Sequence, residues 1–148
     1  MSIHQDSPTV SEVIDGLTAP RRALLTRLRE AVNELGDIEE RTLYDHFCRE
    51  WTPAFYTKGT QLCHVHDFGS GLRATMFVGT KTFEPYLTRS DDLSPANHRA
   101  VAETPAPRNT KELRMPITST EDVDEFMEFV RVKWEFVNGA RAGDGSGG

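Results

Sequence analysis

Residues 110–138 constrain the fold more than any other stretch, because they have the pattern of a strand that runs directly into an apolar helix. Leu113, Met115 and Ile117 alternate with polar residues, which is the period of a half-buried strand. Pro116 cannot donate to a ladder, so this strand is expected to lie at a sheet edge or to end there. The apolar residues that then recur at helical spacing are Val123, Phe126, Met127, Val130, Trp134 and Val137.

The start of this helix carries a Thr-x-x-Glu pattern at Thr118 and Glu121, which predicts a capping box. Arg131 and Lys133 lie in its late turns, where positive charge interacts favourably with the helix dipole. Three further apolar residues widen the buried stripe, namely Phe129, Val132 and Phe136. A stripe this broad predicts contact with two layers of structure, or alternatively a homodimer surface.

Two helices are predicted at the beginning of the chain. Thr9 and Glu12 form a capping pattern for a short first helix. Thr18 and Pro20 open a longer one, and Gly36 ends it as a C-terminal cap. The first 36 residues therefore predict a helical hairpin.

The middle of the chain, from residue 53 to residue 79, has the composition of short strands. Lys58-Gly59 and Gly69-Ser70 are expected to form two-residue hairpin turns. Such turns would place His66 opposite Arg73 and His64 opposite Thr75. The predicted core face carries Cys63, Val65, Leu72, Ala74, Met76 and Val78. The predicted opposite face carries Phe55, Leu62 and Phe77 at one end, and His64, Thr75, His66 and Arg73 at the other.

Residues 37–52 allow two interpretations. Leu43, Phe47 and Trp51 are four apart, as on a helix, but residues 39–44 also have the pattern of a strand followed by an irregular insertion. Further along, Ser94-Pro95 predicts the start of a short helix. The fold class expected from these elements is α+β, with a mostly antiparallel sheet of four or five strands packed against helices from both termini.

Composition limits the domain organisation and the partners. The chain has 148 residues, which suits a single domain over residues 9–138 between a flexible 1–8 segment and a disordered Gly-rich 139–148 tail. A formal net charge of −6 argues against nucleic acid as the main partner. We see no apolar run near the roughly 20 residues that span a bilayer and no signal-peptide core. We therefore expect a cytoplasmic protein without a membrane partner, in which Cys48 and Cys63 are free thiols.

The order of these elements resembles the YdhG-like bacterial domains, a family catalogued mainly as a domain of unknown function. The Pro-Ala-Phe step at 53–55 before a glycine hairpin and the Arg-x-Pro-x strand at 114–117 before the last helix carry the resemblance. Residues 45–52 look like an insertion relative to the family pattern. The resemblance implies an α+β fold and permits iron handling, because some relatives are described as frataxin-like iron carriers. It brings no catalytic residues.

The paired histidines His64 and His66 are the main chemical signal in the chain. Residues two apart on a strand project to the same face, and imidazole suits iron, zinc and copper, so the pair could hold one metal ion. A complete site needs further ligands, for which the candidates are His46, His98, Asp67 and Glu84. Arg73 opposite His66 would repel a cation and favour an anionic ligand. Without a third ligand at a readable spacing, solvent-facing or hydrogen-bonded histidines are the simpler interpretation.

The function expected from these residues is binding rather than catalysis. We expect a non-enzymatic protein that holds a small anion or a metal, iron among the possibilities, on the face of His64 and His66. The residues expected to contact a small ligand are Arg73, Thr75, Tyr56 and Phe77. The alternative is a protein-interaction module or a homodimer without a small ligand.

Overall fold

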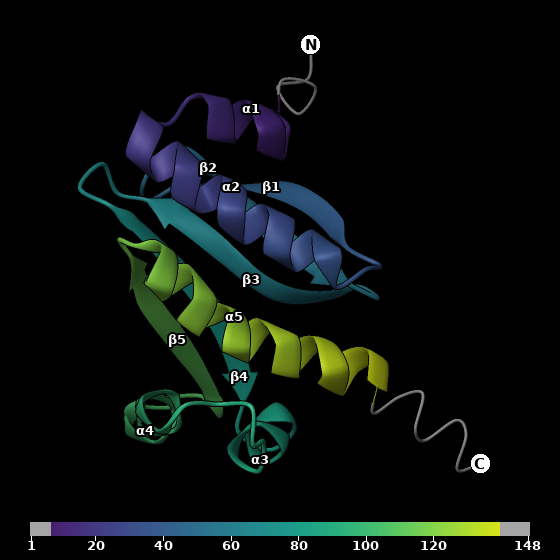
Figure 1. Cartoon of the computed structure of the whole chain (residues 1–148). Coiled ribbons are helices and arrows are strands. Elements are labelled where there is room, and N and C mark those ends of the chain that lie inside the picture. The colour runs from purple at the N-terminus through teal and green to yellow at the C-terminus, as the bar shows by residue number, and fades with distance from the viewer. Residues whose placement is uncertain (1–6, 140–148) are drawn as a thin grey trace.

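A computed structural model describes residues 7–139 and has the expected α+β fold, built on a five-stranded antiparallel sheet in the order β1-β2-β3-β4-β5 (Figure 1). The strands are β1 (Glu39–Asp45), β2 (Glu50–Thr57), β3 (Thr60–Asp67), β4 (Leu72–Gly79) and β5 (Thr110–Ile117). The helices are α1 (Val10–Asp15), α2 (Ala19–Glu34), α3 (Phe83–Thr88), α4 (Pro95–Glu103) and α5 (Thr120–Trp134), which continues into a π-helical turn, Glu135–Gly139.

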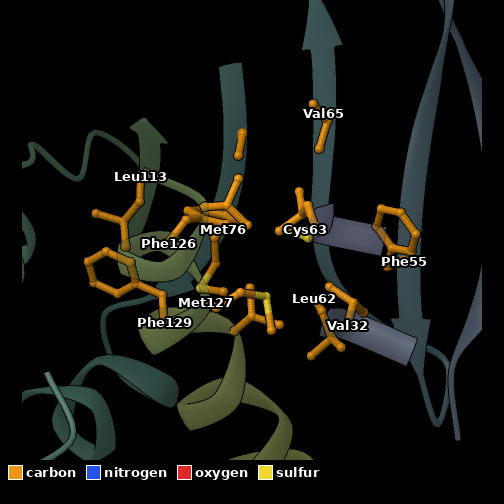
Figure 2. Packing of buried hydrophobic residues seen from close by; sticks show 14 of the residues in the cluster. Val32, Phe55, Leu62, Cys63, Val65, Met76, Leu113, Phe126, Met127 and Phe129 are labelled. Carbon is orange, nitrogen blue, oxygen red and sulfur yellow. The ribbon is translucent and has the colours of Figure 1, made fainter. Parts of the chain in front are cut away.

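Helices α1, α2 and α5 lie over the same face of the sheet, as Figure 1 shows. The core forms where apolar side chains of α2 and α5 meet those of the strands, and Figure 2 shows Val32, Phe126 and Met127 beside Leu62 and Met76. Burial of such side chains is the main favourable term in folding. The face of the sheet opposite these three helices is called the open face below.

Helix α5 contacts both α2 and the sheet, which confirms the prediction of contact with two layers. Phe129 and Val132 are fully buried, and Phe136 packs against Phe83 and Tyr86 with ring centroids 5.2 Å from each. The three residues that suggested a homodimer surface are therefore part of the core or packed against it.

The N-terminus of α5 is capped one residue later than the sequence predicted. Ser119, rather than Thr118, is the N-cap, and its hydroxyl accepts from the backbone N–H of Asp122 at 3.2 Å. The Asp122 carboxylate in turn accepts from the backbone and side chain of Thr118, both at 2.8 Å. Asp122 thus takes the role that the prediction gave to Glu121, because it is the third helical residue after the Ser119 cap. The capping box of α1 at Thr9 and Glu12 forms as predicted.

The register of β3 and β4 matches the prediction. His66 lies opposite Arg73, and His64 lies opposite Thr75. All six residues predicted for the core face belong to the buried cluster, namely Cys63, Val65, Leu72, Ala74, Met76 and Val78.

The predicted places of Phe55 and Leu62 on the opposite face are wrong, since both are fully buried in the core. The register shifts between β2 and β3, where Phe55 pairs with Cys63 but Tyr56 pairs with Gln61. Leu62 is the extra residue of this bulge. An extra residue breaks the alternation of faces, so side chains before and after it do not follow one period.

Strands β1 and β2 form a hairpin, so the strand interpretation of residues 39–44 is correct, and the strand continues to Asp45. The segment that looked like an irregular insertion contains the hairpin turn and the start of β2. Helix α4 begins after Ser94 as predicted, whereas α3 was not predicted. No helix within residues 7–139 is long and apolar enough to cross a bilayer. The segments predicted to be flexible, 1–8 and 139–148, lie outside the described residues except for residues 7, 8 and 139.

Candidate functional site

A groove of about 360 Å³ opens on the open face, over β1 to β4. It forms there because each strand alternates its side chains, so that His64 and His66 point away from the face on which Cys63 and Val65 meet the helices. The residues lining the groove are Leu43, Tyr44, Asp45, His46, Thr52, Gln61, His64, His66 and Phe77. The term "the groove" refers to these nine residues below.

Asp45 holds His66 in a fixed orientation. The Nε2 atom of His66 lies 2.7 Å from Oδ2 of Asp45, and a carboxylate can only accept, so Nε2 carries the proton. The other carboxylate oxygen, Oδ1, accepts from the backbone N–H groups of Phe47 and Cys48 at 2.8 and 3.0 Å. The backbone hydrogen bond from Cys48, with the His66 contact, lowers the pKa of Asp45. Asp45 therefore remains a carboxylate at neutral pH and ties His66 to the β1–β2 turn.

His64 is held by a neighbour on its own strand. Its Nδ1 atom lies 2.8 Å from Oε1 of Gln61, while the Gln61 amide donates to the hydroxyl of Tyr56 at 3.2 Å. Burial lowers the pKa of His64 to about 4, and the proximity of His66 contributes in the same direction. His64 is therefore neutral at pH 7, with its proton on Nδ1 and a lone pair on Nε2.

Aromatic rings make up most of the groove wall. His64 contacts His66 edge-on at 5.0 Å between centroids and lies 5.5 Å from the ring of Phe77. Tyr44 contacts His46 at 4.8 Å. Tyr44 and Phe77 are 40% and 39% exposed, so part of each ring is free for contact with a bound molecule.

The floor of the groove contains polar atoms without a hydrogen-bond partner among the described residues. They include Oγ1 of Thr52 and Nδ1 of His66, both buried. The hydroxyl of Thr75, opposite His64 on β4, is buried and unpaired as well. A buried polar group without a partner costs about 1–3 kcal/mol, but these atoms are closed to solvent, so a bound polar group reaches them only if neighbouring side chains move.

The structure brings together half of the predicted site residues. His64, His66 and Phe77 line the groove. Thr75 lies beside it, and Tyr56 lies behind Gln61, with the Arg41 guanidinium over its ring at 4.3 Å.

Arg73 is also outside the groove lining, although it pairs with His66 across the strands. Its guanidinium lies over the Phe68 ring, 4.5 Å from the centroid. The predicted charge near the histidines is therefore real, since the Phe68 ring under Arg73 stacks on His66 at 5.4 Å between centroids, although Arg73 does not line the groove.

Most of the candidate additional ligands lie away from the histidine pair. His98 contacts the carbonyl of Ser90 at 3.1 Å, and Glu84 pairs with Lys111 at 2.6 Å. Asp67 pairs with Arg21 at 3.1 Å, which leaves His46 as the only one of the four in the groove. Within residues 7–139, no three His, Cys, Asp or Glu side chains form a group that could hold a metal ion.

The two cysteines are free thiols, as expected. Cys63 is completely buried, and burial raises the pKa of its thiol to about 12, so it is not a nucleophile at neutral pH. The pKa of Cys48 is also raised, first by desolvation and then by Asp45. Neither thiol is activated.

Sequence reasoning missed Asp45, Thr52 and Gln61. Asp45 contacts His66 across 21 positions of the chain and across β2, which lies between β1 and β3 in the sheet. A strand interpretation of 39–45 would have placed Leu43 and Asp45 on one face, which is the signal that was available.

Comparison with known proteins found no match: no family model, no curated protein and no solved structure is significantly similar to this chain. The resemblance to YdhG-like domains stays a prediction that its motifs alone carry.

Proposed function

We propose that this protein binds a small organic molecule in the groove. The observation that carries the proposal is the combination of partly exposed aromatic rings with two imidazoles that hydrogen bonds already hold in place in the same groove. Small-molecule sites are concave and largely apolar, with a few polar groups that fix the orientation of the ligand. Phe77 and Leu43 would contact the apolar part of the ligand, and Nε2 of His64 would accept from one of its hydrogen-bond donors.

The polar groups of the groove are held in place before any ligand arrives. Asp45 fixes His66, and Gln61 fixes His64, so neither imidazole has to be ordered on binding. Preorganisation of this kind raises affinity because less conformational entropy is lost. The fixed orientation of both rings also favours a ligand-binding role for the histidine pair over the alternative that they are simply surface residues.

A fragment screen followed by backbone amide NMR shifts tests this proposal. We expect rigid fragments of about ten heavy atoms to bind with dissociation constants of about 1 mM and to shift residues of the groove. Leu43→Trp should weaken fragment binding at least fivefold. Leu43 is partly exposed at the groove wall, and the bulkier indole ring of tryptophan would fill space that a fragment needs.

Ala102→Trp, on the exposed side of α4, adds the same side chain away from the groove and should leave binding unchanged. Fragments that bind wild type and Leu43→Trp equally, or that shift only residues outside the groove, would contradict the proposal.

A metal ion is the second candidate ligand. Histidines that bind metals usually donate their other ring N–H to a carboxylate or carbonyl group, which is how His66 and His64 contact Asp45 and Gln61. Two imidazoles would need further ligands from water or a bound molecule, since no third side chain among the described residues completes the site.

Calorimetry on protein without a histidine tag distinguishes this candidate. If the pair holds a metal, zinc or ferrous iron will bind with one-to-one stoichiometry, and His64→Ala/His66→Ala will abolish that binding. Equal uptake by wild type and the double variant would rule the pair out. His98→Ala serves as the control, because His98 is engaged with the Ser90 carbonyl elsewhere.

A further inference from the structure

The hydrogen-bonding character of the groove follows from its two fixed tautomers. His66 donates from Nε2 to Asp45, and the acceptor that a neutral His66 keeps at Nδ1 is buried. His64 donates from Nδ1 to Gln61, which leaves Nε2 as an acceptor that is not among the buried unpaired atoms. Both acceptor positions of Oδ1 of Asp45 are taken by backbone N–H groups, whereas Oδ2 accepts only from His66 and can accept once more. The groups that the histidine pair and Asp45 leave for a ligand are therefore acceptors, namely Nε2 of His64 and Oδ2 of Asp45.

The electrostatic character of the groove points in the same direction. None of its nine residues is a lysine or an arginine, and Asp45 is its only residue with a full charge at neutral pH when the histidines are neutral. Arg73 does not line the groove, although it stays close to it, over a Phe68 ring that stacks on His66 at 5.4 Å between centroids. A carboxylate in a partly desolvated site attracts cations and repels anions.

The shape of the ligand follows from the rings. Five of the nine lining residues carry one: Tyr44, His46, His64, His66 and Phe77. Aromatic faces favour flat partners through offset stacking, and they also favour cations. An apolar, flat molecule with a positively charged or N–H-bearing end fits both properties of the groove.

We infer that the natural ligand is a planar aromatic molecule that carries hydrogen-bond-donating nitrogen, such as an amine, an amidine or an N–H heterocycle, and is not an anion. This inference rests on the proposed function and narrows its ligand class. The ring would lie between Phe77 and Tyr44, and the N–H groups would reach Asp45 and Nε2 of His64. This class differs from the small anion that Arg73 suggested in the sequence.

Three probes of nearly equal size test the inference: benzamidine, benzamide and benzoate. They share one ring and differ in charge and in donor number. We expect benzamidine to shift the backbone amides of β1 and β3 around the groove, with an affinity at least tenfold higher than that of benzoate. Benzamide should be intermediate, since it keeps donors but has no charge.

Asp45→Asn removes the charge and keeps an oxygen that can accept from the β1–β2 turn, and it should weaken benzamidine about tenfold. Asp124→Asn is the matched control, because Asp124 pairs with Arg27 on the helix side of the molecule. His64→Phe keeps the ring but removes the Nε2 acceptor, and it should also weaken benzamidine, by at least threefold. The folded state of each variant is checked from the dispersion of the same spectra.

The outcomes separate this inference from the proposed function. Preferred binding of benzoate or benzamide in the groove would overturn the inference and leave the proposed function intact. Equal benzamidine affinity in wild type and Asp45→Asn would overturn it too. Failure of all three probes to shift groove residues, while other fragments do so in the screen above, would again reject only the ligand class. If those fragments also fail, the proposed function fails with it.

Discussion

Replacing Lys133 by methionine is expected to remove a pH dependence of about 3 kcal/mol from the free energy of unfolding. Lys133 is buried, with 7% of its surface exposed, and its Nζ donates to the carbonyl of Phe77 at 2.6 Å. Desolvation lowers the pKa of this ammonium from 10.5 to about 8. That difference between the folded and unfolded states corresponds to roughly 3 kcal/mol.

The sign follows from proton binding. Between pH 8 and 10.5 the unfolded chain keeps the Lys133 proton while the folded protein has lost it, so stability from this group rises with pH across that window. Below pH 8 the folded protein must bury the charged Lys133 ammonium, so this gain in the free energy of unfolding is absent. Denaturant unfolding at pH 7.5, 8.5, 9.5 and 10.5 measures the effect as the difference between wild type and Lys133→Met.

The difference between the two proteins is the decisive quantity, because other groups titrate in the same window. The Cys63 thiol, with its pKa raised to about 12, acts in the opposite direction above pH 9, but it is present in both proteins. Methionine also leaves the Phe77 carbonyl without this donor, which shifts the curve by a constant. A constant difference across the whole pH range would contradict the assignment of the shifted pKa to Lys133. Lys58→Met, at an exposed turn, is the control and should show no such trend.

Acidification from pH 6.5 to 4 is expected to destabilise the protein through His64. Its pKa is about 4 in the folded state and near 6.5 when unfolded, so the unfolded chain binds a proton in this window and the folded protein does not. The contribution of His64 to the free energy of unfolding is therefore fully present above pH 6.5 and is lost as the pH falls to 4. Because water reaches part of the ring from the groove, we expect about 1–2 kcal/mol.

His64→Phe should abolish this component while keeping an aromatic ring in the groove wall. Unfolding by urea at pH 7, 6, 5 and 4.5 measures it, and the comparison again cancels the contributions common to both proteins. One of these is Glu50, whose raised pKa gives the opposite trend in the acid range. His98→Phe is the control for the loss of a histidine at a site outside the groove. If wild type and His64→Phe lose stability in parallel, His64 is not the group responsible.

Local sequence was sufficient to predict most of the helices and strands, and also the pairing register of β3 and β4. Gly69 and Ser70 define a tight turn, and a turn of known length determines which residues of β3 and β4 face each other. That is why the pairs His64–Thr75 and His66–Arg73 could be predicted from a single sequence. The breadth of the apolar stripe on α5 likewise predicted its two packing partners, because a helix that buries more than one face needs more than one neighbour.

Predictions failed where a single residue broke a period. The bulge at Leu62 sends this side chain and Phe55 into the core, and no local pattern marks it, since the bulge depends on how β2 and β3 pair. For Lys133 the sequence indicated only a favourable positive charge in the late turns of the helix, and it gave no sign of burial. Lys133 is buried because the stripe of α5 extends around it and its ammonium finds a carbonyl on β4.

Sequence by itself determined the α+β class, the helical hairpin, the β3–β4 register and the face shared by the two histidines, because each of these follows from a local period or a turn of fixed length. Only the tertiary structure decided the chemistry of the groove. The carboxylate that fixes His66 comes from a different hairpin, and the Arg73 guanidinium opposite His66 lies over the Phe68 ring and does not line the groove. Contacts between residues far apart in the chain depend on strand order and on which face the helices cover, and neither quantity is encoded in a spacing.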